Sequence, residues 1–150
     1  MKTKQQTAPD IQNLSEFLCF SVYSSNLAFG KIYKPVLEKF GLTYTQYITI
    51  VALWEEDQLT VSALGEKLYL ESNTLTPILK KLEIAGFVTR RRDVEDERVV
   101  RVSLTKKGRS LRESCPELDI TEATGLSTEE FTQMQRAISK LRDSLNRSRA

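Results

Sequence analysis

Histidine is absent from this sequence of 150 residues, and cysteine occurs only twice. Without an imidazole, the chain cannot use histidine as a base or as a metal ligand. Cys19 and Cys115 are too few and too far apart for a zinc site, and they do not form a CxxC pair. We therefore expect no metal ion, no cofactor and no structural disulfide, and each cysteine has to be judged as a thiol.

Glycine-rich loops and long apolar stretches are also missing. The six glycines stand singly, so the sequence has no loop for holding phosphates. The uncharged stretch at residues 17–30 is interrupted by serines and an asparagine, and it falls short of the roughly 20 apolar residues of a membrane span. The N-terminus lacks the apolar core of a secretory signal. These absences predict a cytoplasmic protein with no membrane partner.

The positive charge is unevenly distributed, although the composition is otherwise that of an ordinary globular protein. The formal net charge is +2. Residues 71–112 contain 11 Lys and Arg side chains against 6 Asp and Glu side chains, which is a local excess of five. Such a basic segment is either a solvated face or a surface for nucleic acid.

The hydrophobic pattern predicts two helices at the N-terminal end. Apolar residues recur at helical spacing from Asp10, a suitable N-cap, towards Phe40, and Gly41 ends the pattern. Thr43 and Gln46 then form a capping-box pattern that begins a second helix. We expect the buried face of this second helix to consist of Tyr47, Ile50, Val51 and Trp54.

A helix-turn-helix and a hairpin follow. Thr60 caps a short helix, and a second helix over residues 72–85 ends at Gly86, the glycine expected just past a helix end. Two β-prone runs, residues 87–92 and 99–104, are joined by a charged tip. The predicted fold class is therefore mostly α with a small β-hairpin wing.

The C-terminal third returns to helix. A helix restarts at Thr105, and Pro116 interrupts it. Ser127 and Glu130 form a second capping box. It begins a last helix whose apolar residues are Phe131, Met134, Ile138, Leu141 and Leu145.

This order of elements is that of a winged helix-turn-helix, in which the second helix enters the major groove of DNA and the hairpin reaches the backbone or the minor groove. The helix at residues 72–85 begins with hydroxyl and amide side chains, which bond base edges or phosphates. With two basic residues of the same segment, the expected contacts to double-stranded DNA are Ser72, Asn73, Thr74, Thr76, Pro77, Lys80 and Arg90.

Four segments resemble the core of MarR-type winged-helix repressors, namely residues 59–65, 74–88, 93–98 and 104–108. The most specific parts are Asp96-x-Arg98 and Leu104-Thr105-x-x-Gly108. The resemblance implies a homodimer on a pseudo-palindromic operator, with Arg98 in the minor groove and Asp96 orienting it. It implies a single domain over residues 1–150, with dimerisation helices at about residues 10–40 and 127–147 and a winged helix-turn-helix at about residues 43–112.

The front of the sequence resembles the organic-hydroperoxide-sensing branch of that family, in residues 18–23, 32–37 and 42–47. The resemblance implies that Cys19 is the redox sensor, that Tyr23, Tyr33 and Tyr44 are its partners, and that an organic hydroperoxide is the inducer. Phenolic O–H donors stabilise a thiolate over a thiol, and the thiolate is the form that a peroxide oxidises. From the residues alone, the usual interpretation is different: a free cysteine on the apolar face of a helix is usually a small buried hydrophobic residue, and tyrosines are common in cores.

The role of Cys115 has two alternatives. Two-cysteine members of the branch carry a resolving cysteine near the C-terminal end, and their spacing places it at about residues 124–126, where this sequence has none. Cys115 is either a displaced resolving cysteine or an incidental residue beside Pro116, and we favour the second alternative.

We expect a DNA-binding transcriptional regulator, a repressor, that releases its operator when an organic hydroperoxide oxidises Cys19. The alternative is a MarR-type regulator released by a small aromatic or lipophilic ligand. An enzyme, such as a thiol peroxidase, is disfavoured because the residues that activate such a cysteine are missing and the basic wing would have no role.

Overall fold

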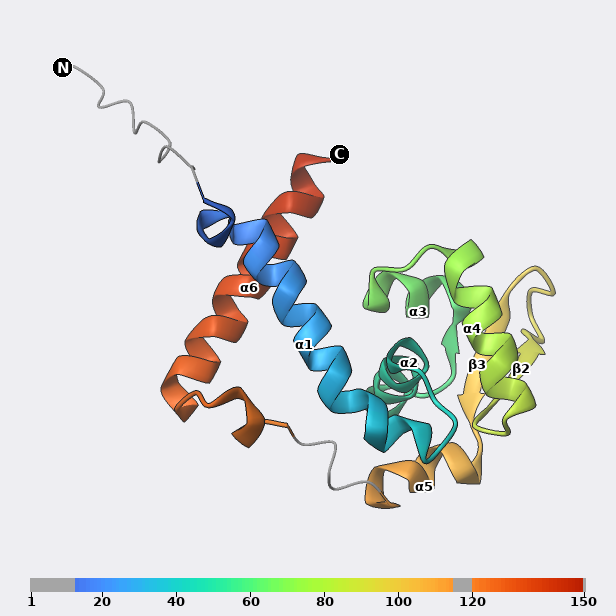
Figure 1. Ribbon diagram of the computed structural model, residues 1–150. Coiled ribbons are helices and arrows are strands. Elements are labelled where there is room, and N and C mark those ends of the chain that lie inside the picture. The colour runs from blue at the N-terminus through green and yellow to red at the C-terminus, as the bar shows by residue number, and fades with distance from the viewer. Residues whose placement is uncertain (1–12, 115–119, 150) are drawn as a thin grey trace. The chain divides into compact units, whose positions relative to one another are not determined.

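The protein, described by a computed structural model over residues 13–114 and 120–149, is mostly helical with one small sheet (Figure 1). Its elements in chain order are α1 (Leu18–Glu38), α2 (Tyr44–Glu55), β1 (Leu59–Thr60), α3 (Val61–Leu68), α4 (Ser72–Ile84), β2 (Val88–Arg92), β3 (Val100–Leu104), α5 (Lys106–Ser114) and α6 (Thr128–Ser148). The chain divides into two compact units, Met1–Gly108 and Arg109–Ala150. The expected fold class is confirmed.

The first helix begins later than the sequence pattern predicts. A single 3₁₀ turn, Leu14–Glu16, precedes α1, and the extended backbone of Phe17 separates the two. The turn closes because the Glu16 carboxylate accepts a hydrogen bond from the Asn13 N–H at 3.2 Å. Asp10, the expected N-cap, lies outside the described residues.

The capping box of α2 is confirmed, but its expected buried face is confirmed only at Ile50. Thr43 and Gln46 exchange side-chain and backbone hydrogen bonds of 2.9 and 3.3 Å. Of the four residues expected inside, only Ile50 is fully buried, whereas Tyr47, Val51 and Trp54 are half-buried. The buried residues of α2 are Gln46, Thr49, Ile50, Ala52 and Leu53. The buried polar residues are tolerated because the Thr49 hydroxyl donates to the Thr45 carbonyl and the Gln46 side-chain carbonyl accepts from the Thr43 N–H.

The helix-turn-helix, α3 and α4, is closed by a tight turn. The N–H of Leu70 donates to the carbonyl of Gly65 at 2.9 Å, and that of Tyr69 donates to the carbonyl of Glu66 at 3.3 Å. A Cβ on Gly65 would lie 2.7 Å from the Leu70 carbonyl oxygen, so glycine is required at this close approach. The predicted caps at Thr60 and Gly86 are confirmed.

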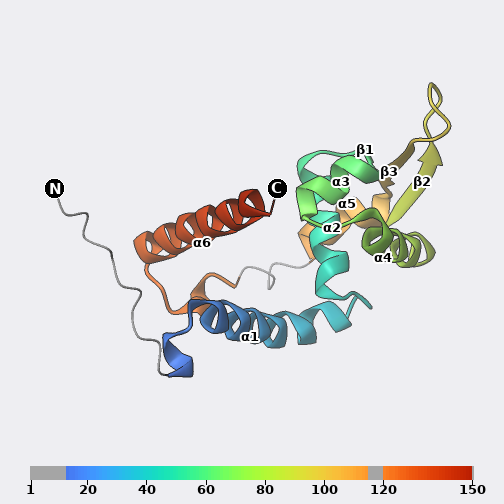
Figure 2. The ribbon, with the colours of Figure 1, turned by 90° about the horizontal axis from the view of Figure 1, so that it is seen from above.

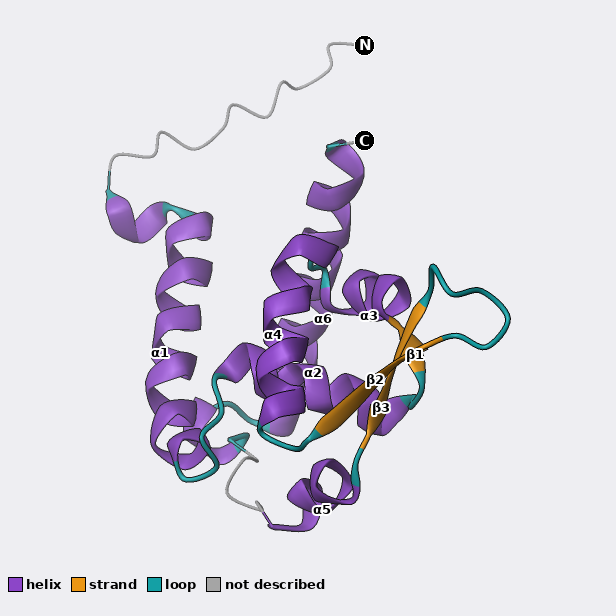
Figure 3. Cartoon of the chain, turned by 90° about the vertical axis from the view of Figure 1, so that its right-hand side faces the viewer, coloured by secondary structure: helices purple, strands orange, loops and turns teal. Residues whose placement is uncertain are grey.

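The wing is an antiparallel hairpin of β2 and β3, to which the two-residue strand β1 is added on the other side of β3 (Figure 3). The hairpin pairs Val88 with Leu104 and Arg92 with Val100. Its tip projects beyond the helices of the same unit (Figure 2). The sequence analysis missed β1, because two residues carry no strand pattern of their own.

A continuous apolar core supports the wing and α4. Its fully buried members include Ile50, Leu53, Leu64, Leu75, Leu79, Leu82, Phe87, Val88 and Val102. They come from α2, α3, α4, the sheet and the connection between α4 and β2, so these elements form one packed body. Among the described residues, no helix combines the length and the apolar character that a membrane span requires.

Candidate DNA interface and thiol site

The outer face of α4 carries the residues expected to contact DNA. Ser72, Asn73, Thr74, Thr76, Pro77 and Lys80 are all exposed. Leu75, Leu79 and Leu82 are buried on the opposite face and fix the helix to the core. Helical spacing thus separates the packing residues from the polar residues, which face outward together.

Hydrogen bonds within α4 limit what its side chains can offer. The hydroxyl of Thr76 donates to the carbonyl of Ser72 at 2.7 Å. Its proton is engaged, and its oxygen keeps lone pairs for an external donor such as an adenine or cytosine amino group. Pro77 has no N–H, so the carbonyl of Asn73 receives no backbone hydrogen bond from it. While its bond to the Ser72 carbonyl is kept, the Thr76 hydroxyl can accept a hydrogen bond from a ligand but cannot donate one.

The tip of the wing holds a prearranged arginine. Two guanidinium nitrogens of Arg98 donate to the two carboxylate oxygens of Asp96 at 3.0 and 3.1 Å, and the Arg98 N–H also donates to this carboxylate. These bonds from Arg98 lower the pKa of Asp96, and the carboxylate raises the pKa of Arg98. The Arg98 side chain is nevertheless 91% exposed. A charged fork is thus held in one orientation and open to a ligand.

A second carboxylate, Asp93, shapes the rest of the tip. It accepts from the N–H groups of Glu95 and Asp96 at 2.8 and 3.3 Å, and from the guanidinium of Arg101. The Arg101 side chain lowers the pKa of Asp93 more than any other group. Arg101 also donates to the carbonyl of Gln58 at 3.1 Å. The tip is therefore anchored to the segment before β1. The sequence analysis did not predict this contact.

Arg90 lies apart from the exposed basic residues. Its backbone N–H and its guanidinium donate to the carboxylate of Glu83 at 2.8 and 3.2 Å, so it joins β2 to α4. These bonds lower the pKa of Glu83, with the backbone bond contributing most. The Arg90 side chain is only 23% exposed. This geometry gives Arg90 a structural contact, and its contact with DNA stays a prediction.

The structure places the expected sensor residues in two groups. Cys19, a free thiol, is exposed in the first turn of α1, and Tyr23 lies one turn further along the helix. The rings of Tyr33 and Tyr44 lie 5.1 Å apart, joining the end of α1 to the start of α2. Residues 19 and 33 are 14 positions apart on one helix, which corresponds to about 21 Å. Cys19 and Tyr33 of one chain therefore do not meet, and Cys115 lies outside the described residues.

Aromatic contacts continue from the tyrosine pair into the winged unit. Tyr33 lies 6.1 Å from Tyr47, and Tyr47 meets Trp54 edge-on at 6.0 Å. The indole N–H of Trp54 donates to the carbonyl of Gly108 at 2.9 Å. The ring contacts thus run from α1 along α2 to Trp54, and Trp54 is hydrogen-bonded to the first turn of α5, the helix that follows the wing.

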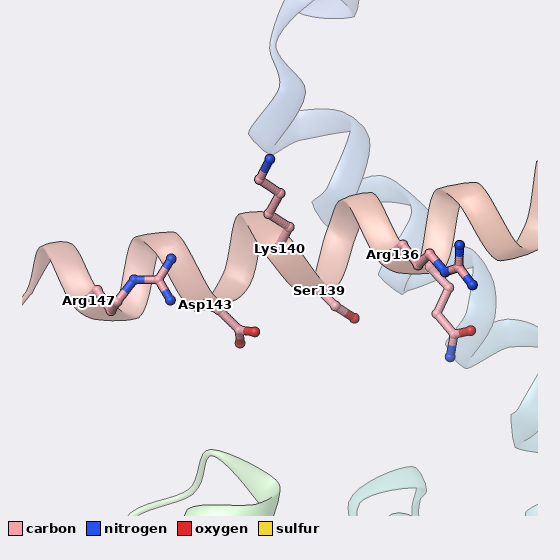
Figure 4. Close-up of a pocket in the computed structure, with 6 residues that line it drawn as sticks. Arg136, Ser139, Lys140, Asp143 and Arg147 are labelled. Atoms are coloured by element: carbon pink, nitrogen blue, oxygen red, sulfur yellow. The ribbon is translucent and has the colours of Figure 1, made fainter.

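One pocket on the described surface has walls from a single helix. A polar pocket on α6 is lined by Gln135, Arg136, Ser139, Lys140, Asp143 and Arg147, all from one helix (Figure 4). Side chains of a single helix do not enclose a ligand, because a binding pocket needs walls from several elements. Within residues 13–114 and 120–149, no three His, Cys, Asp or Glu side chains are grouped to hold a metal ion.

Comparisons with known proteins agree with this geometry. A family model described as "Transcriptional regulator SarA/Rot" matches residues 31–115. The organic hydroperoxide resistance transcriptional regulator of Bacillus subtilis is 43% identical over 140 residues, covering 91% of this chain and 95% of that protein. The HTH-type transcriptional regulator TtmR of Methylorubrum extorquens is 42% identical, covering 91% and 71%.

Solved structures show the same architecture. The structure of reduced AbfR bound to DNA is 34% identical, covers 91% of this chain and 95% of that chain, and superposes with a TM-score of 0.78. A further structure, of AbfR of Staphylococcus epidermidis, gives 33% identity and a TM-score of 0.74, covering 89% and 92%. The prediction of a MarR-type winged-helix fold is confirmed. The chain belongs to the SarA/Rot family of MarR-like winged-helix transcriptional regulators.

Proposed function

We propose that this regulator binds a pseudo-palindromic operator as a homodimer and releases it when an organic hydroperoxide oxidises Cys19. The observation that carries the proposal is the exposed, free thiol of Cys19 in the first turn of α1. The similarity over 91% of the chain to a regulator of organic hydroperoxide resistance supports this inducer over a small aromatic or lipophilic ligand.

A second copy of the chain accounts for the apolar surface of α1 and α6. Large apolar side chains are exposed on these helices and on the segment before α1: Leu14, Phe17, Leu18, Val22, Leu27, Phe29, Ile32, Met134, Ile138 and Leu145. Exposed apolar surface of this extent marks an interface between proteins. A two-fold axis is the commonest way to cover the same surface on two identical chains.

The two-fold axis also completes the thiol site. Because Cys19 and Tyr33 of one chain lie about 21 Å apart along α1, tyrosine hydroxyls reach Cys19 from the second copy. Antiparallel pairing of α1 with the α1 of the partner subunit brings residue 19 opposite residue 33 when the helices cross near Asn26, midway between them. Tyr23 of the same chain and the Tyr33–Tyr44 pair of the second copy then form the sensor site.

Oxidation at this site proceeds in two steps. The Cys19 thiolate attacks the terminal oxygen of the hydroperoxide, the O–O bond breaks, and a sulfenic acid and an alcohol are formed once a proton reaches the alkoxide. A second thiol then attacks the sulfenic sulfur, which gives a disulfide and water. The added group has to be accommodated between the two copies of α1, so these helices shift. The two copies of α4 then no longer have the spacing that matches the two half-sites of the operator.

The DNA contacts we propose are those of the exposed face of α4 and the wing. Ser72, Asn73, Thr74, Thr76, Pro77 and Lys80 read or position the major groove, and Arg98, held by Asp96, enters the minor groove. Arg90 contributes through its charge while it holds the wing to α4. In this role the protein acts as a repressor in the cytoplasm and performs no catalysis.

Cys19→Ser tests the proposal. Binding of the reduced protein to a labelled duplex from the region upstream of its own gene is measured by fluorescence anisotropy, before and after treatment with cumene hydroperoxide. We expect the variant to bind as the wild type does and to ignore the peroxide, whereas Cys115→Ser still responds when a small thiol is present to cap the oxidised Cys19. Release of Cys19→Ser by peroxide would refute redox sensing at this residue. A peroxide-induced covalent dimer that is absent from Cys115→Ser would make Cys115 the resolving cysteine.

A further inference from the structure

The tip of the wing lies beyond the paired strands, so other bonds have to hold it. The ladder of β2 and β3 ends with the pair Arg92 and Val100. Two backbone hydrogen bonds close the connection between them: the Asp93 N–H donates to the Val99 carbonyl at 2.8 Å, and the Val99 N–H donates to the Asp96 carbonyl at 3.0 Å. They fix the two ends of the connection and leave the course of the chain within it to side chains.

The Asp93 side chain fixes that course. Its Oδ1 atom accepts from the N–H groups of Glu95 and Asp96 at 2.8 and 3.3 Å, in the manner of an Asp side chain that closes a turn of its own backbone. Its Oδ2 atom accepts from Arg101, whose guanidinium also donates to the Gln58 carbonyl at 3.1 Å. The Asp93 side chain is only 14% exposed. The carboxylate is therefore held inside the tip from two sides.

The same bonds determine the direction of Arg98. Asp93 fixes the backbone at Asp96, and the Asp96 carboxylate accepts three hydrogen bonds of 3.0–3.1 Å from the N–H and the guanidinium of Arg98. The Arg98 side chain is 91% exposed, so packing does not orient it. Its direction depends on Asp96, and the place of Asp96 depends on Asp93.

The charge of Asp93 cannot itself favour DNA. A carboxylate is repelled by phosphates, so on Coulomb's law alone Asp93 weakens the affinity of the wing for a duplex. It also lies near a second carboxylate: the bonds from Arg98 lower the pKa of Asp96, and the negative charge of Asp93 acts in the opposite direction. Any contribution of Asp93 to binding must therefore come from the geometry that it imposes on the tip.

We propose that Asp93 is a positioning residue for DNA binding, which holds Asp96 in place and so presents Arg98 in one orientation before the duplex arrives. This inference rests on the DNA binding by Arg98 proposed above. It makes a buried carboxylate increase the affinity for an anion, because an arginine that is already ordered loses less conformational freedom on binding. Loss of the Asp93 carboxylate and loss of a simple surface carboxylate then change the affinity in opposite directions.

The test measures Kd of the full-length, reduced protein for a labelled duplex from the region upstream of its own gene, by fluorescence anisotropy. Asp93→Ala should raise Kd at least about 5-fold, because Arg98 in both wings of the dimer then has to be ordered on binding. Asp93→Asn keeps an oxygen for the two N–H groups and loses the charge, so its Kd should lie between those of the wild type and Asp93→Ala.

Glu95→Ala is the matched control. Glu95 is exposed at the same tip, and its carboxylate takes no part in the hydrogen bonds among the described residues. The substitution removes the same charge as Asp93→Ala and keeps the N–H that donates to Asp93. Its Kd should equal that of the wild type or be lower, since one repulsive charge is lost.

A double-mutant cycle separates positioning from general support of the wing. If Asp93 acts through Arg98, adding Asp93→Ala to Arg98→Ala should not raise Kd further. If Asp93→Ala does not fold, Asp93→Asn takes its place in the cycle with the same expectation. The inference is overturned by an equal loss of affinity in both backgrounds, by wild-type affinity in Asp93→Ala, or by an equal loss in Glu95→Ala. Failure of the wild type to bind the duplex would instead refute the proposed function.

Discussion

Replacing Arg98 by alanine should change how DNA binding depends on salt. Each cation that neutralises a phosphate contributes about 0.9 to the slope of log K against log salt. A dimer has two wings, so Arg98→Ala should flatten the slope by about 1.8. Between 50 and 200 mM salt, the affinity ratio of wild type to variant should then fall by about 12-fold. The fold should remain intact, because the Arg98 side chain is 91% exposed.

The assay is fluorescence anisotropy of the full-length protein with one duplex at four or more salt concentrations. Arg98→Lys is the matched control, since it keeps the charge and loses the two-pronged bond to Asp96. The slope of log K against log salt should equal that of the wild type, while the affinity falls by the same factor at every salt concentration. A wild-type slope in Arg98→Ala would refute the reasoning, because the wing arginine would then neutralise no phosphate.

Three further predictions concern the scaffold. Acid should weaken the link between wing and α4: the Arg90 bonds hold the pKa of Glu83 below its ordinary value of 4.5, so the stabilisation is present above pH 4.5 and is lost as the pH falls through the lowered pKa. Acid titration followed by circular dichroism should show a smaller stability loss for Glu83→Gln than for the wild type. Gly65→Ala should lower the free energy of unfolding by about 1–3 kcal/mol in urea, because its Cβ would lie 2.7 Å from a backbone oxygen, and an unchanged midpoint would contradict this. Trp54→Phe should lower the free energy of unfolding by about 1 kcal/mol, because the hydrogen bond to Gly108 is lost. Its peroxide response in the anisotropy assay should be weaker than that of the wild type, because this bond joins α2 to the start of α5.

The sequence predicts the parts of the fold that depend on local chemistry. Thr43, Thr60 and Ser127 cap their helices as expected, and Gly86 ends α4 with a positive φ, because caps and stops act within a few residues. Features set by distant segments were not predictable. Strand β1 exists through pairing with β3, some 40 residues away, and the buried face of α2 depends on which side α3 and α4 approach.

The candidate site shows the same division. Residue types predicted the polar face of α4 and the exposed arginine of the wing, because spacing alone places them outside. The contact of Arg90 with Glu83 and the contacts of Asp93 were missed, since hydrogen bonds between separate elements leave no periodic signal. The separation of Cys19 from Tyr33 follows from one helix being continuous, which the pattern did predict.

The surroundings of Gly108 have a mechanical consequence. A Cβ there would lie 2.3 Å from the Phe87 carbonyl oxygen, and the Gly108 N–H donates to the Thr105 hydroxyl, which itself donates to the carbonyl of Gly86. Because the Trp54 indole also donates to the Gly108 carbonyl, this one residue joins α2, the base of β2 and the start of α5. Close-packed joints of this kind transmit displacement instead of absorbing it. A tilt of α2 would therefore be passed through Gly108 to the base of the wing, and Arg98, at the far end of the wing, would be displaced the most.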